Sequence, residues 1–140
     1  MKWLILGTVV ILFAMGYYFE NAKGSNERWY TKAQVAKGEK LFAANCAVCH
    51  GLKAQKTINW RQKLPNGHYT PPPLNGSAHA WHHTFAQFIN QIDNGGVQYG
   101  GTMPAFKGVF TDEEKKDIIS YFQSFWNDKI YKDWYGRSGL

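Results

Sequence analysis

Five consecutive residues, Cys46-Ala47-Val48-Cys49-His50, constrain this chain more than any other feature of its sequence. The spacing C-x-x-C-H is the attachment signature of a covalent c-type haem. Each thiol adds across one vinyl group of the haem, so the two cysteines must lie about one helical turn apart, and the next residue brings an imidazole under the iron. We therefore predict that Cys46 and Cys49 hold one haem and that His50 is an axial ligand of its iron.

The same cysteine pair has three other interpretations: a redox disulfide, half of a zinc site, or a structural disulfide. A zinc site needs a second pair of ligands, and the chain has two cysteines in all. A redox C-x-x-C is expected after a strand in an α/β pattern, which is missing from this sequence. Haem attachment is the favoured interpretation.

Met103 is the candidate for the second axial ligand. The other methionines, Met1 and Met15, lie in the first segment, whereas Met103 lies in Gly100-Gly101-Thr102-Met103-Pro104-Ala105-Phe106. Glycines let the backbone approach a flat ligand, and a proline stiffens the position after it. A methionine that fills a core is the alternative. Ligation by His50 and Met103 would raise the reduction potential, which places the site at the oxidising end of a respiratory chain.

The first segment is an uncharged apolar run from Trp3 to Phe19. Seventeen residues give about 26 Å of helix, close to the thickness of a bilayer core. We predict a membrane anchor over residues 1–20, a linker over 21–30 and a haem domain over 31–140 with a C-terminal extension. The expected location is the bacterial inner membrane, crossed once, with the haem domain in the periplasm. A cleaved signal peptide is the competing interpretation.

Charge is distributed unevenly along the chain. Residues 21–70 contain nine basic and two acidic side chains, whereas residues 71–140 contain six basic and seven acidic ones. A one-sided positive field favours redox protein partners with an acidic docking surface, or a membrane respiratory complex. A solvated lysine face is the alternative. Neither a nucleic acid nor a small-molecule substrate is expected. Four lysines flank the attachment motif and are the first candidates for docking: Lys37, Lys40, Lys53 and Lys56.

Three segments have helical patterns. Apolar residues recur at helical spacing over about 32–45 and 84–93. The third helix begins with a capping box, Thr111 to Glu114, and continues into an aromatic run that ends at Trp126. No strand pattern of any length appears. The predicted fold is all-α, with three main helices around one haem.

The order of these motifs resembles that of the class I cytochrome c family. C-x-x-C-H is followed by Pro-Leu-x-Gly, by Gly-Thr-Met-Pro-Ala-Phe and by a terminal aromatic helix, and the likeness covers about residues 30–126. The resemblance implies that the first and last helices cross closely, with two residues of each in contact: Gly38 and Phe42 on one, Ile118 and Tyr121 on the other.

The resemblance also assigns haem contacts to Pro72 and Leu74. It implies that the carbonyl of Pro72 accepts the proton of the second ring nitrogen of His50, which would orient the imidazole. Indole, phenol and guanidinium donors suit the haem propionates, and the candidates for this contact are Trp60, Arg61, Tyr69, Trp81 and Tyr99.

Two stretches depart from the family pattern: residues 52–70 and the tail 127–140 are longer than expected, and each fits a lid, a docking surface or extra packing against the haem edge.

A separate feature is a group of three imidazoles within five residues, His79, His82 and His83. They suit copper or another metal, although they also fit a helix cap, propionate contacts or a solvated surface.

The predicted function is one-electron transfer by a haem protein that is not itself an enzyme. It would serve as a membrane-tethered carrier or as the haem subunit of a respiratory complex. The alternative is a haem enzyme or sensor with an exchangeable sixth ligand, against which a bound Met103 argues.

Overall fold

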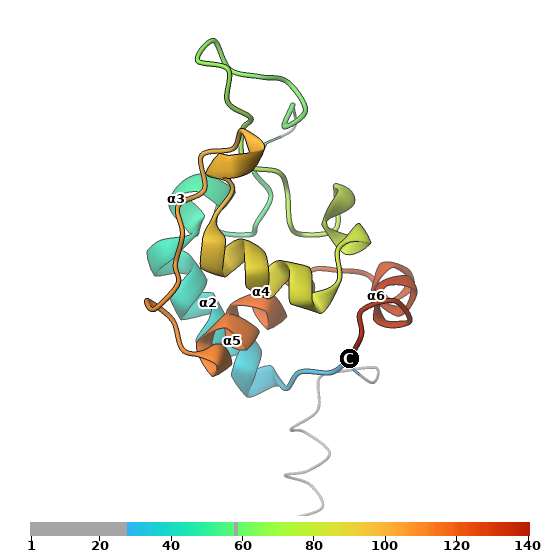
Figure 1. Cartoon of the computed structure of the whole chain (residues 1–140). Helices are drawn as coiled ribbons and strands as arrows, with labels where there is room; N and C mark the ends of the chain where they lie inside the picture. Colours follow the sequence, from blue (N-terminus) through green and yellow to red (C-terminus); the bar gives the residue numbers. More distant parts are fainter. Residues whose placement is uncertain (1–27, 58) are drawn as a thin grey trace, which may run out of the picture. The chain divides into compact units, whose positions relative to one another are not determined.

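The computed structural model describes residues 28–57 and 59–140 (Figure 1). Residues 34–140 form one compact unit, and the described residues before them belong to another. The helices are α2 (Lys32–Asn45), α3 (Ala47–His50), α4 (Phe85–Asn94), α5 (Asp112–Gln123) and α6 (Asp128–Tyr135), with two 3-10 helices, η1 (His79–His82) and η2 (Val97–Tyr99). No strand occurs in the described ranges, where Lys63 and Tyr69 form an isolated bridge. The all-α prediction is confirmed.

The predicted membrane span, residues 3–19, lies outside the described residues. Across the part of the chain that the structure describes, no helix has both the length and the apolar character needed to cross a bilayer.

Two helices begin with capping boxes. The hydroxyl of Thr111 accepts the N–H of Glu114 at 3.2 Å, and the Glu114 carboxylate accepts the N–H of Thr111 at 2.8 Å. This is the box that the sequence predicts at the start of α5. Thr84 and Gln87 form an equivalent box at the start of α4, which the sequence analysis missed. Both boxes satisfy amide donors that the first helical turn leaves unpaired.

The crossing of α2 and α5 depends on Gly38. A Cβ atom at this position would overlap the carbonyl oxygen of Asp117 and lie 3.1 Å from the Cβ of Tyr121. One turn later, the ring of Phe42 lies 5.2 Å from that of Tyr121. The two helices are therefore close enough for backbone to touch backbone, as the resemblance implied, and they lie side by side in Figure 1.

The C-terminal tail forms a further helix, α6, beside η1 (Figure 1). Trp134 is 1% exposed, and its ring lies 5.6 Å from that of Trp126 and 6.3 Å from that of Phe88 in α4. Its indole N–H donates to the carbonyl of His83 at 2.8 Å. These contacts pack the tail against α4, Trp126 and the segment before α4.

Candidate haem site

The attachment motif lies at the turn where α2 ends and α3 begins. The N–H of Cys46 donates to the carbonyl of Phe42 at 2.8 Å, and the N–H groups of Cys49 and His50 both donate to the carbonyl of Cys46. Cys46 and Cys49 are therefore one helical turn apart. Both are free thiols, and burial, followed by the nearby Cys49, raises the pKa of Cys46 to about 11.

His50 is buried, with an exposed fraction of 8%. Its Nδ1 lies 3.3 Å from the carbonyl oxygen of Pro72, the contact that the resemblance implied. Burial lowers the pKa of His50, and the hydrogen bond to Pro72 opposes this only in part. The ring is thus neutral, with Nδ1 as the donor and Nε2 left to face a metal ion, as ligation requires.

Hydrogen bonds to the backbone of Leu74 fix the segment that carries Pro72. The N–H of Leu74 donates to the carbonyl of the buried Ala54 at 2.8 Å, and its carbonyl accepts the indole N–H of Trp126 at 2.7 Å. The turn after the attachment motif and the end of α5 therefore hold Pro72 in place against His50.

Met103 lies in a loop that packs against the end of α4. The N–H of Gly96 donates to the carbonyl of Met103 at 2.9 Å. Gly95 has φ of 69°, and a Cβ there would come within 2.5 Å of that carbonyl, so the loop requires glycine for both reasons. The side-chain amide of Gln91 lies 3.6 Å from Sδ of Met103. One lone pair of the Met103 sulfur then faces Gln91, and the other stays available to bind an iron.

Sequence reasoning missed Gln91. The signal that could have found it is its spacing, because Gln91 follows Phe88 by three residues and so lies on the apolar face of α4.

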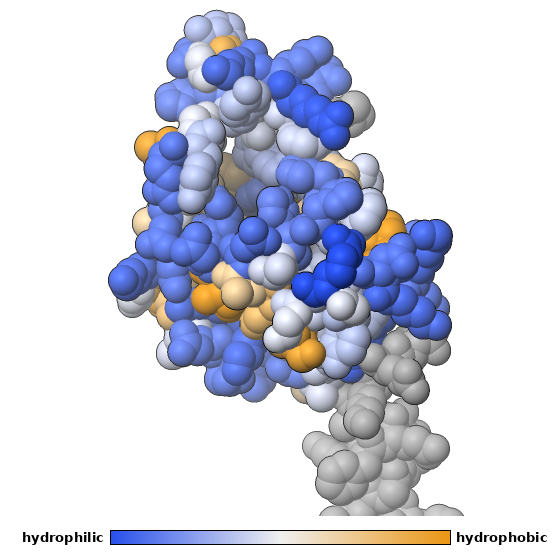
Figure 2. Space-filling model, turned by 45° about the vertical axis from the view of Figure 1, so that its right-hand side comes forward, coloured by the Kyte–Doolittle hydropathy of each residue, from blue (hydrophilic) through white to orange (hydrophobic). Residues whose placement is uncertain are grey.

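These residues fit one haem. Two free thiols lie one turn apart, the buried imidazole of His50 has one nitrogen held by a hydrogen bond, and the thioether of Met103 is positioned by its loop. Figure 2 shows a hollow between the projecting loop of residues 59–70 and the body of the molecule. The roles of Cys46, Cys49, His50 and Met103 toward a haem stay predictions.

The structure divides the predicted propionate contacts into two groups. Trp60 stacks on His79, with ring centroids 4.3 Å apart, and Arg61 lies 4.9 Å from the Trp60 ring. Trp81 instead stacks on His82, at 3.9 Å. The two remaining candidates are exposed tyrosines, Tyr69 on the loop and Tyr99 on η2. Within residues 28–57 and 59–140, no three His, Cys, Asp or Glu side chains are placed to hold a metal ion, so the metal interpretation of the histidines gains no support.

Comparison with known proteins identifies the family. Residues 33–122 match the family described as cytochrome c oxidase, cbb3-type, subunit III. The chain is 32% identical over 107 residues to cytochrome c6 of Synechocystis sp., covering 73% of this chain and 71% of that protein. It is 33% identical over 107 residues to cytochrome c6 of Leptolyngbya boryana, covering 73% and 100%. Thiosulfate dehydrogenase of Psychrobacter arcticus is 33% identical over 93 residues, which are 61% of this chain and 24% of that protein. No solved structure matches.

The predicted location, a single pass through the bacterial inner membrane, is wrong. The comparisons overturn it, because the relatives include cytochromes c6 of Synechocystis sp. and Diacronema lutheri. An apolar run of seventeen residues lies at the lower limit for a spanning helix, and such a run alone does not separate an anchor from a signal peptide.

A C-x-x-C-H turn with a buried, oriented histidine thus occurs in a chain whose residues 33–122 match a cytochrome family and whose relatives include cytochromes c6. Haem-based electron transfer and a covalently bound haem c follow from that membership. The chain belongs to the cytochrome c family, within the group described as cytochrome c oxidase, cbb3-type, subunit III, and is a monohaem class I c-type cytochrome.

Proposed function

We propose that this protein is a one-electron carrier whose iron is ligated by His50 and Met103. The hydrogen bond from His50 to the carbonyl of Pro72 carries the proposal, because it leaves Nε2 as the free ring nitrogen and fixes the plane of the imidazole. When bound, the haem supplies an iron that cycles between the ferric and ferrous states.

Met103 decides between a carrier and an enzyme. A thioether in the sixth position leaves no site for a substrate, and Gln91 and Gly96 hold Met103 in its loop. A haem enzyme with an open position is the second candidate. The likeness to thiosulfate dehydrogenase gives it little weight, because it covers 24% of that protein.

The partners that we infer are redox proteins with an acidic docking surface, in a respiratory pathway. Support for the docking surface comes from exposed lysines close to the attachment motif, Lys53 and Lys56 after it and Lys37 and Lys40 in α2. Lys56 also donates to the carbonyl of Val48 at 3.0 Å, so one positive charge is held against the motif itself. Support for the pathway comes from the description of the matching family, which names an oxidase subunit.

The test is the optical spectrum of the holoprotein and of Met103→Ala, each oxidised and then reduced. We expect the oxidised wild type to show the weak far-red band of a thioether-ligated haem. Met103→Ala should keep the covalent haem, lose this band and bind carbon monoxide when reduced. Thr102→Ala, an exposed neighbour in the same loop, is the control and should keep the wild-type spectrum. An unchanged spectrum in Met103→Ala would contradict the ligand assignment.

A further inference from the structure

The proposed function leaves one charged side chain of the core without a role, that of Lys115 near the start of α5. Lys115 precedes Ile118, Ile119 and Phe122 by three, four and seven residues, so it lies on the same buried row of the helix. Its side chain is 8% exposed. An apolar residue is expected at such a position, because lysine is almost never buried unless it is paired.

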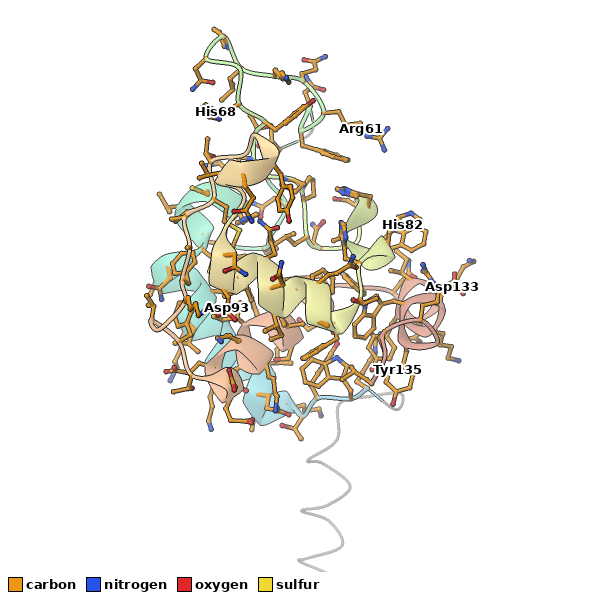
Figure 3. All side chains as sticks on the ribbon, viewed as in Figure 1. Arg61, His68, His82, Asp93, Asp133 and Tyr135 are labelled. Atoms are coloured by element: carbon orange, nitrogen blue, oxygen red, sulfur yellow. The ribbon has the colours of Figure 1, made fainter. Side chains whose placement is uncertain are left out.

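Two carboxylates hold the ammonium group of Lys115. Its Nζ lies 2.8 Å from Oδ1 of Asp93 in α4 and 3.1 Å from Oδ1 of Asp112 in α5. Asp112 is exposed and belongs to the same helix, whereas Asp93 lies between α4 and α5 in Figure 3 and is 21% exposed. The hydrogen bonds to Asp93 and then to Asp112 raise the pKa of Lys115, so the ammonium group stays charged at neutral pH. The ion pair of Lys115 with Asp93 therefore ties the start of α5 to the end of α4.

The end of α4 is also the support of the loop that carries the proposed sixth ligand. The N–H of Phe106 donates to the carbonyl of Ile92 at 2.9 Å, and the N–H of Lys107 donates to the carbonyl of Asp93 at 3.1 Å. Carbonyls in the last turn of a helix have no partner within the helix, so the loop supplies the donors that they lack. Residues 103–107 are thereby laid along the last turn of α4.

Asp93 makes contacts in two directions. Its carbonyl accepts the N–H of Lys107 from the loop, and its carboxylate pairs with Lys115 of α5. The side chain of Gln91, one turn of the same helix, also reaches Sδ of Met103 at 3.6 Å. A movement of the end of α4 away from α5 would therefore carry the Met103 loop with it.

We propose that Lys115 is a positioning residue for the sixth haem ligand: its ion pair with Asp93 holds the end of α4, and with it the Met103 loop, against α5. The proposal rests on the proposed function, because it requires that Met103 binds the iron. Loss of the ion pair should raise the fraction of molecules in which Met103 is detached from the iron.

The alternative role for this ion pair is stability alone. A buried ion pair adds little net stability, since both ions lose their hydration, whereas removal of one partner leaves the other charge unpaired. The contacts of Asp93 with both the loop and α5 favour a role in fixing one arrangement of these parts.

Lys116 offers a matched control in the same helix. Its Nζ lies 2.8 Å from Oε1 of Glu113, a contact within α5 between side chains that are 40% and 74% exposed. Lys116→Met therefore removes the same charge from the same helix and leaves the contact between α5 and α4 in place.

The experiment measures the binding of imidazole to the ferric holoprotein, where imidazole competes with Met103 for the iron. Wild type, Lys115→Met, Asp93→Asn, their double variant and Lys116→Met are compared by the loss of the weak far-red band. We expect Lys115→Met and Asp93→Asn each to raise the apparent affinity for imidazole about fivefold or more, the lower end of ordinary couplings between sites. The double variant should show no further rise, because both substitutions break one interaction. Lys116→Met should bind imidazole as the wild type does.

Urea unfolding of the same proteins, followed by far-UV circular dichroism, separates positioning from stability alone. A lower free energy of unfolding in Lys115→Met with the wild-type affinity for imidazole overturns the proposal. An equal rise in affinity in Lys115→Met and Lys116→Met also overturns it, because net charge would then be the cause. If Lys115→Met does not fold, the double variant leaves no unpaired charge and carries the test, and wild-type affinity in that variant overturns the proposal.

These outcomes are separable from failure of the proposed function. That function fails if the optical spectrum of Met103→Ala is unchanged, whereas the role of Lys115 is tested in variants that all retain Met103.

Discussion

Gly38 is the residue that lets α2 touch α5, because any side chain there would overlap the carbonyl of Asp117. That carbonyl belongs to a helix backbone, which cannot rotate away as a side chain could. We expect Gly38→Ala to lower the free energy of unfolding by about 1–3 kcal/mol, the usual cost of overpacking. Urea unfolding of the holoprotein, followed by far-UV circular dichroism, measures this change in the free energy of unfolding.

Gly136→Ala is the matched control. Gly136 has φ of −62°, and the nearest atom to an added Cβ is 3.8 Å away. Alanine should be neutral there or stabilising by up to about 1 kcal/mol, because it restricts the unfolded chain. A Gly38→Ala variant as stable as Gly136→Ala would show that α2 and α5 can separate without cost.

Single residues differ in how far the sequence predicts them. Cys46, Cys49 and His50 could be found because covalent chemistry fixes their spacing along the chain. Spacing places Gln91 on the apolar face of α4 but does not reveal its contact with Met103, which lies in another element. Trp60 likewise meets His79 across nineteen residues of chain. Such contacts depend on the folded backbone.

At the scale of elements, the start of α5 depends on the Thr111 capping box. Thr111→Ala removes the acceptor of the Glu114 N–H and should lower the free energy of unfolding by about 1 kcal/mol.

The backbone N–H and then the hydroxyl of Thr111 lower the pKa of Glu114. The contribution of Glu114 is thus present above the ordinary glutamate pKa and is lost as pH falls through the lowered value. Acid unfolding curves of wild type and Glu114→Gln should converge at low pH, and parallel curves would contradict this.

The tail helix α6 makes a second element-level prediction. Trp134→Ala should lower the free energy of unfolding by about 3–5 kcal/mol, since it removes a buried indole and its hydrogen bond to His83. Tyr135→Ala, at a side chain that is 44% exposed, is the control and should change little. Thermal unfolding of both variants measures the difference, and a small loss in Trp134→Ala would mean that the tail detaches freely.

The sequence predicts α2, α4 and α5 well, since each has a long apolar face or a strong cap. It leaves α6 undefined. That helix has Asn127 as its N-cap and an apolar face with Tyr131 and Trp134, but at eight residues it is marginal by itself. Its stability comes from Trp126 and Phe88, which belong to other parts of the chain, so a local pattern could not establish it.

At the scale of the whole molecule, the uneven charge should govern association with an acidic redox partner. We expect the bimolecular electron-transfer rate to fall as ionic strength rises, because salt screens the attraction. Lys53→Glu should lower this rate and weaken its salt dependence. Lys132→Glu, an exposed lysine of α6, carries the same charge change and should have the smaller effect. Equal effects of the two variants would show that net charge, and not a docking face, controls the encounter.

The hydrogen bond from Trp134 to His83 joins two parts of the chain that the ribosome makes at different times. A ribosome makes the attachment motif well before Trp134, so a chain that stops between them can still present Cys46, Cys49 and His50 for haem attachment. Such a chain would lack the indole that anchors His83. Covalent attachment of the haem therefore does not report whether α6 has been made and packed, and the two must be measured separately.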